Sequence, residues 1–399
     1  MRILMIAKDI PYPPISGGTL RAYNLLRRIA TRHQVWLATH LCTPDEAEGV
    51  AHLQEFCCHV ATGYLRRRHP LAHLPGLLRY AAAGRPLELK FYYSNELADK
   101  IRRLASEVEF DIVLIEESQT MLYLEVLPPD TRSKCVLTFY DIVFERSART
   151  SRMARSLVLR GRAWLDSLIM RRWEPRYAER FDRCITVSET DRDLLMAANP
   201  RLRVDVIPNG VDTRVYQPLP QDSTSPALLF VGSMSYPPCN DAVLYFTSDI
   251  LPCIRRAVPD VEMWIVGREP SPEVMQLNGN GVHVTGRVDD VRPYYGRSTV
   301  CVVPVRSGGG TRLKILEAMA LGRPVVSTTI GCEGLDVADG EHLLIADSPE
   351  QFAEQTGRLF IDQALYERIT TNARQLVVTR YDWDVIAGQL MQICAEVVD

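Results

Sequence analysis

The stretch RSGGGTRLKILEAMALGRPVVST, residues 306–328, decides the fold class of the C-terminal half of this chain. It follows an apolar strand pattern at residues 300–305, passes through three consecutive glycines, and continues as a helix with apolar side chains at core spacing. Gly322 stands where a helix ends, Pro324 prevents its continuation, and residues 325–328 predict a second strand. The order strand, glycine-rich turn, helix, strand predicts a parallel β–α–β unit.

The glycine-rich turn and the start of this helix have the features of a diphosphate-binding site. The residues that we expect to hold the phosphates are Gly308, Gly309, Gly310, Thr311, Arg312 and Lys314. Glycines allow close approach of backbone N–H groups, and a helix N-terminus adds positive potential. The macrodipole makes a cation in the first turn cost ~0.3–1 kcal/mol unless an anion lies opposite. Arg312 and Lys314 therefore predict a bound anion.

Glu317 lies one helical turn after Lys314 on the same face of the helix. In that position its carboxylate reaches the ribose hydroxyls of a bound nucleotide. The alternative is a loop followed by a core helix, in which Lys314 and Glu317 form a solvated ion pair. The residues alone leave both interpretations open.

Short apolar runs alternate with helical patterns along the whole chain. We predict strands at residues 2–7, 35–40, 112–116, 135–139, 184–187, 204–207, 227–231, 262–266, 282–285, 300–305, 325–328 and 342–346. Helical patterns between them include residues 20–33, 96–107 and 189–198. This alternation predicts an α/β protein of two Rossmann-like, doubly wound domains that face a central cleft, with ligands beyond the carboxyl ends of the strands.

The domain boundaries follow from a change of composition in the middle of the chain. Residues 213–226 are rich in Pro, Ser, Thr and Asp, which is typical of a linker. This linker separates a Rossmann-like domain at 1–212 from a second one at 227–382. We expect a final helix at about residues 383–399 to pack back on the N-terminal domain.

The composition excludes several classes of protein. The 399 residues are 46% hydrophobic and 24% charged, which is typical of a globular protein large enough for two domains. No apolar run approaches the ~20 residues of a membrane-spanning helix, and the first residues do not resemble a secretory signal. The ten cysteines lack metal-ligand spacing, so we expect reduced thiols and a cytoplasmic location.

The two halves of the chain carry opposite charge. Residues 1–210 contain 31 Lys and Arg against 25 Asp and Glu, a net of +6, and residues 211–399 contain 15 against 24, a net of −9. The basic half predicts an anionic partner such as a membrane surface. We expect no nucleic-acid partner, because the imbalance is mild and no binding motif accompanies it.

Two segments of the basic half combine arginines with apolar side chains. One contains Arg66, Arg67 and Arg68 and is followed by the apolar residues 71–80; the other, residues 146–172, contains eight arginines among leucines and a tryptophan. This mixture suits an anionic membrane leaflet. The alternative is an ordinary solvated helix face with arginines over acidic neighbours.

The run LEAMALGRPVVST, residues 316–328, resembles the donor-binding signature of retaining glycosyltransferases of family 4, which have the GT-B fold. In that family the helix carries two glutamates. The resemblance implies that Glu317 takes the second, ribose-binding position, whereas Gly309 stands where the first glutamate contacts the transferred sugar. Backbone amides are then expected to replace that contact.

Two further segments resemble the C-terminal domain of the same family. FVGSMSYPPCNDAVLYF, residues 230–246, is similar to its opening strand and turn, which implies a donor contact at Gly232. Many members carry an Arg and a Lys there, where this chain has Ser233 and Pro238. Arg312 and Lys314 are our candidates for the displaced charge.

GRVDDVRPYY, residues 286–295, resembles the segment whose backbone contacts the nucleotide base. The resemblance implies base contacts near Arg287 and Val288. A simple strand-to-helix turn capped by Asp289 or Asp290 is the alternative, and both interpretations can hold together.

The N-terminal segment PYPPISGGTLRAYNLL, residues 11–26, places Gly17 and Gly18 between the first strand and the first helix. We interpret them as a loop whose backbone lies near the donor phosphate and the acceptor; the alternative is a strained turn that needs glycine φ values. A G-x-G-x-x-G pattern is missing, which argues against a nicotinamide dehydrogenase. Arg21 and Glu117 are candidates for the acceptor side, although a solvated rim also explains Glu117.

The run LTFYDI, residues 137–142, stands where many family members carry a histidine near the anomeric carbon. The resemblance places Tyr140 at that histidine position. We expect Tyr140 to position the reacting sugar or the acceptor and Asp141 to accept a hydrogen bond from the acceptor hydroxyl. Lys314 completes the catalytic set by stabilising the leaving diphosphate. A buried aromatic with a satisfied hydroxyl is the alternative for Tyr140.

The resemblance implies a hexosyltransferase of the exopolysaccharide-type subgroup that acts with retention in the assembly of a cell-surface polysaccharide or glycolipid. Its partners would be a nucleoside diphosphate sugar, a glycan or lipid-linked acceptor and an anionic membrane surface, with the protein peripheral on the inner face of the membrane. We expect no cofactor and no metal, because no DxD-type carboxylate pair stands near the phosphate site. A nucleotide-sugar 2-epimerase on the same fold and a non-catalytic partner subunit, suggested by Gly309 and Tyr140, are the alternatives.

Overall fold

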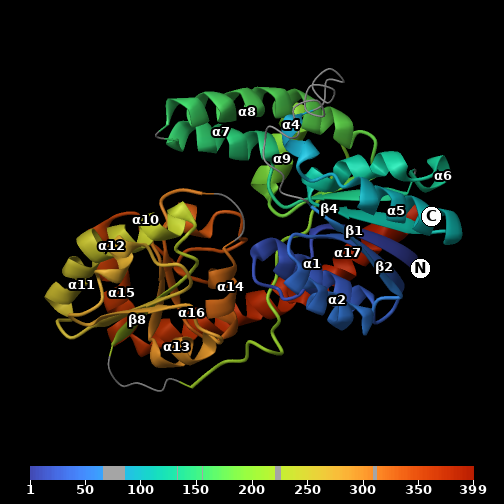
Figure 1. The fold of residues 1–399 in the computed structure, drawn as a ribbon. Helices are drawn as coiled ribbons and strands as arrows, with labels where there is room; N and C mark the ends of the chain where they lie inside the picture. Colours follow the sequence, from blue (N-terminus) through green and yellow to red (C-terminus); the bar gives the residue numbers. More distant parts are fainter. Residues whose placement is uncertain (66–85, 133, 155, 221–225, 309–311) are drawn as a thin grey trace. The chain divides into compact units, whose positions relative to one another are not determined.

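The computed structural model describes residues 1–399 except 66–85, 133, 155, 221–225 and 309–311. The chain divides into two compact units (Figure 1). Unit 1 comprises Met1–Pro208 together with Ile386–Asp399, and unit 2 comprises Asn209–Val385.

Unit 1 is built on a seven-stranded parallel sheet with the order β3-β2-β1-β4-β5-β6-β7. Its strands are β1 (Arg2–Asp9), β2 (Gln34–Leu41), β3 (His59–Tyr64), β4 (Ile112–Glu116), β5 (Cys135–Phe139), β6 (Arg183–Thr186) and β7 (Val204–Val206). The central strands β4 and β5 are buried along their whole length, which explains their unbroken apolar runs.

Helices cover both faces of this sheet, with α1 and α2 on one side and α5 on the other (Figure 1). The helices of unit 1 are α1 (Gly17–Ile29), α2 (Ala47–Gln54), α4 (Leu87–Lys90), α5 (Asn95–Glu107), α6 (Pro129–Arg132), α7 (Val143–Met153), α8 (Leu157–Ala178) and α9 (Glu189–Ala198), with 3₁₀ segments at Pro44–Glu46 and Ser118–Val126. The last helix, α17 (Trp383–Val398), begins at the end of unit 2 and lies mostly in unit 1.

Unit 2 repeats the plan with a six-stranded parallel sheet of order β10-β9-β8-β11-β12-β13. Its strands are β8 (Ala227–Val231), β9 (Glu262–Val266), β10 (Val282–Gly286), β11 (Val300–Val303), β12 (Val325–Ser327) and β13 (Leu344–Ile345). Its helices are α10 (Pro237–Tyr245), α11 (Leu251–Ala257), α12 (Pro272–Met275), α13 (Arg292–Arg297), α14 (Leu313–Ala320), α15 (Pro349–Ile361) and α16 (Gln363–Leu376), with π-helical segments at Phe246–Ile250 and Val377–Tyr381 and a 3₁₀ segment at Ile330–Cys332.

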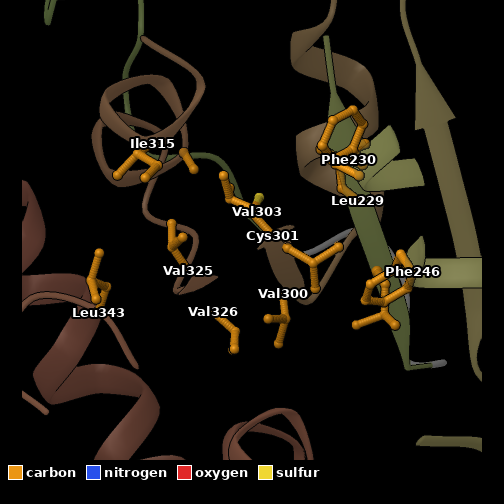
Figure 2. Close-up of a cluster of buried hydrophobic side chains, with 14 of the residues drawn as sticks. Leu229, Phe230, Phe246, Val300, Cys301, Val303, Ile315, Val325, Val326 and Leu343 are labelled. Atoms are coloured by element: carbon orange, nitrogen blue, oxygen red, sulfur yellow. The ribbon is translucent and has the colours of Figure 1, made fainter. Parts of the chain in front are cut away.

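The core of unit 2 lies around the central strand β11. Figure 2 shows Val300, Cys301 and Val303 of β11 between side chains of β8 and β12. Ile315 of α14 is fully buried in the same cluster. The helix that follows the glycine-rich turn is therefore fixed on the sheet by its apolar face, which also holds its N-terminus in place.

The predicted α/β fold with two doubly wound parallel sheets is confirmed. Both sheets reverse their strand order next to the first strand, between β1 and β4 in unit 1 and between β8 and β11 in unit 2. In folds of this type ligands bind beyond the carboxyl ends of the strands at this reversal. The loops after these four strands are therefore where sites are expected.

Two predictions about elements were wrong. Strand β3 was missed, because the sequence HVATGY of this edge strand has no continuous apolar run and its two end residues are exposed. Helix α1 begins at Gly17 instead of Leu20, because Ser16 and Thr19 form a reciprocal cap at its N-terminus. Gly17 and Gly18 are thus helical residues and do not form a strained turn.

Candidate functional site

The glycine-rich turn follows β11 in unit 2 and needs a glycine at its first position. Gly308 has a φ of 106°, which side chains rarely adopt. A Cβ there would lie 2.8 Å from the Tyr236 hydroxyl and 3.0 Å from Pro238 Cγ. The backbone at Gly308 is therefore packed directly against the start of α10. The predicted phosphate ligands Gly309, Gly310 and Thr311 lie outside the described residues.

Two cations stand at the N-terminus of α14. Arg312 is the residue before the helix, and its guanidinium donates a hydrogen bond to the Gly308 carbonyl at 2.9 Å. Lys314 lies in the first turn, with its ammonium 4.0 Å from the centre of the Phe230 ring and 3.5 Å from Cys239 Sγ. Burial lowers the pKa of Lys314. Within α14, all of which is described, the first turn contains no acidic residue, so positive charge dominates there.

Glu317 follows one turn later on the same helix. Burial raises the pKa of its carboxyl to about 7, against the attraction of Lys314. The hydroxyl of the fully buried Tyr295 donates a hydrogen bond to Glu317 at 3.5 Å. Lys314 and Glu317 are half-buried, and the protein around them desolvates both groups, so they are not a fully solvated pair.

Gly232, directly after β8, makes room for Lys314. A Cβ at this position would lie 2.7 Å from Lys314 Nζ and 3.0 Å from Cys239 Sγ. Gly232 therefore leaves the space that the Lys314 side chain occupies, and any larger residue would displace that side chain.

Arg268 is a further candidate that was not singled out from the sequence, although the segment that contains it, residues 264–270, resembles the family strand that ends in glycine and lines the donor site. It follows β9, and its Nε donates a hydrogen bond to the Ser233 hydroxyl at 3.2 Å. The backbone beside it is tight, since a Cβ at Gly267 would lie 1.7 Å from the Gly232 carbonyl oxygen. Arg268 therefore brings a guanidinium to the turn after β8. The glycine and arginine in WIVGREP at the end of an apolar strand were the available signal.

The segment predicted to contact a base connects β10 to α13. Arg287 is exposed, and Val288 is half-buried against the core of unit 2. The Asp290 carboxylate accepts a hydrogen bond from the backbone N–H of Arg292 at 2.9 Å. The N-cap residue of α13 is Val291, whose side chain makes no cap hydrogen bond, so the prediction that Asp289 or Asp290 is the N-cap was wrong. The Asp290 hydrogen bond still fixes the backbone that precedes the helix.

In unit 1 the corresponding position lies at the start of α1. A Cβ on Gly18 would lie 3.4 Å from both Glu117 Oε1 and Tyr140 Cδ2. A small cavity is lined by Gly18, Glu117, Tyr140 and the β1 residues Lys8 and Asp9. Three of the strands that meet at the reversal of the sheet, β1, β4 and β5, therefore contribute to one site.

A buried network of charged and polar groups lies beneath this cavity. Arg21 and Glu116 are each 1% exposed. The Arg21 guanidinium donates a hydrogen bond to the Pro208 carbonyl at 2.7 Å and lies 5.6 Å from the centre of the Tyr140 ring. Burial raises the pKa of Glu116, and burial together with the nearby Glu116 charge raises the pKa of Tyr140 well above its usual value.

This network changes the roles of two predicted residues. Arg21 points into unit 1, so it positions neighbouring groups and does not present its guanidinium to an acceptor. The Tyr140 hydroxyl is also buried, which leaves the ring as the part of Tyr140 that borders the cavity. Their neighbours come from distant strands, and the local sequence carried no sign of this arrangement.

Two ion pairs border the same region. Lys8, which the sequence analysis missed, pairs with Glu117 through Nζ and Oε2. The Asp141 carboxylate accepts a hydrogen bond from Arg149 of α7 at 2.8 Å, although burial raises its pKa. Glu117 and Asp141 are therefore held by cations and are not a freely solvated rim.

Neither a metal cluster nor a membrane span is found in the described part of the chain. Outside the gaps in the description, no three His, Cys, Asp or Glu side chains come together as metal ligands. The same residues include no helix that is both long and apolar enough to cross a bilayer.

Known proteins resemble this chain over both units. A family model described as Glycosyltransferase Family 4 matches residues 15–215, and one described as Glycosyl transferases group 1 matches residues 225–362. A phosphatidyl-myo-inositol mannosyltransferase of Mycobacterium leprae is 28% identical over 334 residues, which cover 78% of this chain and 82% of the relative. An uncharacterized 44.6 kDa protein in the cps region of Klebsiella pneumoniae is 23% identical and covers 96% of both chains.

A solved structure with the same fold is that of Anabaena HepE in complex with UDP and glucose. It aligns with 99% of this chain and 100% of its own, at a TM-score of 0.68 and 16% identity. The likeness shows that this chain has the GT-B fold. The matches favour neither an epimerase nor a non-catalytic subunit, since the family models and the named relatives are glycosyltransferases. Because the first family model spans half of the sequence, this protein belongs to glycosyltransferase family 4 and is a glycosyltransferase.

Proposed function

We propose that this enzyme transfers a sugar with retention from a nucleoside diphosphate sugar to a glycan or lipid-linked acceptor, in the assembly of a cell-surface polysaccharide or glycolipid of the exopolysaccharide type. The observation that carries the proposal is the start of α14, where Arg312 and Lys314 precede Glu317 by about one turn. Cations at a helix N-terminus suit a diphosphate, and a carboxylate one turn later suits ribose hydroxyls.

The nucleoside diphosphate part of the donor would be bound mainly by unit 2. Gly308 to Lys314, joined by Arg268, would hold the diphosphate, and these cations would stabilise the charge that develops on it as the bond to the sugar breaks. Glu317 would accept hydrogen bonds from the ribose, and the backbone at Arg287 and Val288 would contact the base. Gly309 leaves the transferred sugar without a glutamate contact, and we assign that contact to backbone amides.

Residues of unit 1 would contact the acceptor and the reacting sugar. Tyr140 and the carboxylate of Glu117 line its cavity, Asp141 follows Tyr140 in the chain, and Gly17 and Gly18 begin the helix beside the cavity. The acceptor hydroxyl would attack the sugar from the face that the diphosphate leaves, with a hydrogen bond to Asp141. No metal and no cofactor take part in this proposal.

The relatives support a lipid acceptor and a cell-surface role. One is named for phosphatidyl-myo-inositol, a phospholipid, and another for its place in a cps region. HepE was solved with UDP and glucose, which supports a nucleotide-sugar donor. We place the enzyme in the cytoplasm, peripheral on the inner face of the membrane and without a nucleic-acid partner.

A donor titration tests the proposal. Isothermal calorimetry with UDP-, GDP- and dTDP-sugars should identify one class that binds, and Lys314→Ala should weaken it by about tenfold or more, as expected for a charge-assisted bond of ~1.5–3 kcal/mol. Lys100→Ala removes a half-buried lysine of α5, which pairs with Glu96, and serves as the matched control. Equal donor affinity in Lys314→Ala and wild type would contradict the phosphate assignment.

A further inference from the structure

Helix α8 has apolar side chains on two opposite faces. On one face Ala163, Met170 and Tyr177 are buried against the rest of unit 1. On the other, Leu157 and Val158 are 82% and 83% exposed. A surface helix normally has a single apolar stripe toward the core and a polar opposite face. The second apolar face of α8 therefore needs an explanation outside the core of unit 1.

The exposed apolar residues form one continuous stripe. They recur at helical spacing along the side of α8 that faces away from α7, and the members are Leu157, Val158, Trp164, Leu165, Leu168 and Ile169. Of the eighteen large hydrophobic side chains that are exposed in the described part of the chain, eight fall within residues 153–169. Exposed apolar groups gathered in this way mark an interaction surface, whereas isolated ones do not.

Arginines border the stripe. Residues 143–178 contain nine arginines against three acidic residues, a net of +6. Among those described, Arg160, Arg162, Arg171, Arg172 and Arg176 of α8 are all exposed. Of these five described arginines only Arg162 has a carboxylate within salt-bridge distance, that of Asp166 at 3.8 Å on the same helix. The surface thus combines an apolar stripe with exposed arginines beside it and at its C-terminal end.

Helices α7 and α8 form a helical hairpin, and hydrogen bonds between the two helices lie beneath this stripe. Figure 1 shows α7 and α8 lying side by side. Ser167 donates a hydrogen bond to the Phe144 carbonyl at 2.9 Å, and Ser151 donates one to the Arg160 carbonyl at 3.0 Å. The buried Glu174 carboxylate accepts the backbone N–H groups of Val143 and Phe144, at 3.3 Å each. These hydrogen bonds fix α8 against α7, so the position of the stripe does not depend on a bound partner.

We propose that the exposed face of α8 docks the enzyme on an anionic lipid bilayer. A helix that lies in the interface inserts apolar side chains, with tryptophan at the headgroup level, while its arginines meet anionic headgroups. A second copy of the chain is a poorer occupant, because a symmetric contact would bring the two sets of arginines together. The inference deepens the membrane part of the proposed function and rests on it for the lipid-linked acceptor.

Flotation with vesicles tests the docking. The full chain should bind vesicles of phosphatidylcholine with 30% phosphatidylglycerol much better than vesicles of phosphatidylcholine alone, and less at high salt because screening weakens the charge contribution. Leu165→Glu with Leu168→Glu should abolish binding. Arg160→Gln, Arg171→Gln and Arg172→Gln together should reduce partitioning about a hundredfold, from a loss of about fivefold for each cation.

Matched controls come from other exposed positions. Ile361→Glu at the end of α15 changes a side chain that is 86% exposed, and a triple variant of Arg102, Arg103 and Arg358 to Gln removes three exposed arginines elsewhere. Both controls should bind vesicles as wild type does. Circular dichroism and thermal melting establish that each variant is folded.

Three results would overturn the docking: no binding of the wild type to anionic vesicles, equal binding by the α8 variants, or a wild-type dimer in ultracentrifugation that the Leu165 and Leu168 changes convert to a monomer. Calorimetric donor binding should be unchanged in every α8 variant. If the wild type binds vesicles but no nucleotide sugar, the docking is supported and the proposed donor is contradicted. If it binds a nucleotide sugar but no vesicles, only the docking is contradicted.

Discussion

At the scale of single residues, burial sets the protonation of the groups that would meet the donor. Lys314 and Glu317 lie on one face of α14, and desolvation pushes each toward its neutral form. A bound diphosphate would stabilise the charged form of the lysine, and ribose hydroxyls would stabilise the carboxylate. A donor bound at the start of α14 would therefore favour the charged forms of both groups.

The raised pKa of Glu317 predicts a pH dependence of donor binding. With a pKa of about 7, its carboxyl is mostly protonated at pH 6 and ionised at pH 8. The ionised form accepts hydrogen bonds from both ribose hydroxyls, whereas the acid has lost acceptor capacity. Calorimetry should therefore show an affinity that rises up to about tenfold from pH 6 to pH 8. Glu317→Gln should remove this rise, and a flat profile in the wild type would contradict the ribose assignment.

At the scale of elements, a single buried carboxylate joins α8 to α7. Glu174 is completely buried and accepts two backbone N–H groups at the N-terminus of α7. Burial nevertheless raises its pKa to about 7, so desolvation outweighs these hydrogen bonds. The hairpin that carries the apolar face of α8 therefore depends on a titratable group.

Glu174 makes stability depend on pH in a defined direction. Its pKa in the folded protein is above the ordinary 4.5, so the folded state holds a proton that the unfolded chain has released between about pH 4.5 and 7. The contribution of this group to stability is full below pH 4.5 and is lost as the pH rises toward 7, by at most ~1.4 kcal/mol per unit. Chemical denaturation should show a shallower decline over this range for Glu174→Gln, which keeps an acceptor oxygen. If the free energy of unfolding falls equally with pH in the variant and the wild type, Glu174 does not cause the pH dependence.

At the scale of the whole molecule, two sheets with corresponding strand orders each place a candidate site beside the reversal of that order. In unit 1 the residues follow β1, β4 and β5, and in unit 2 they follow β8, β9 and β11. Both sets lie where the strand order reverses, as the doubly wound plan requires. The charge also differs between the halves, with the basic excess in residues 1–210 and its strongest cluster on α7 and α8.

Sequence patterns sufficed for the fold and for the glycine that ends the helix of the candidate donor site. Apolar runs located nearly all the strands, and Gly322, with a φ of 71°, ends α14 as predicted. Side-chain partners were not accessible, because they depend on contacts between distant strands. Lys8 pairs with Glu117 across two strands, Arg268 reaches a turn 35 residues earlier, and Arg21 is buried although its neighbours in the sequence look like those of a surface helix.

A crystal structure with the bound nucleotide sugar tests the central claim most directly. The account predicts the diphosphate at the N-terminus of α14, within hydrogen-bond distance of Arg312 or Lys314, and the ribose hydroxyls on Glu317. A nucleotide bound elsewhere, with the start of α14 free of phosphate and its cations paired with the protein's own carboxylates, would contradict it.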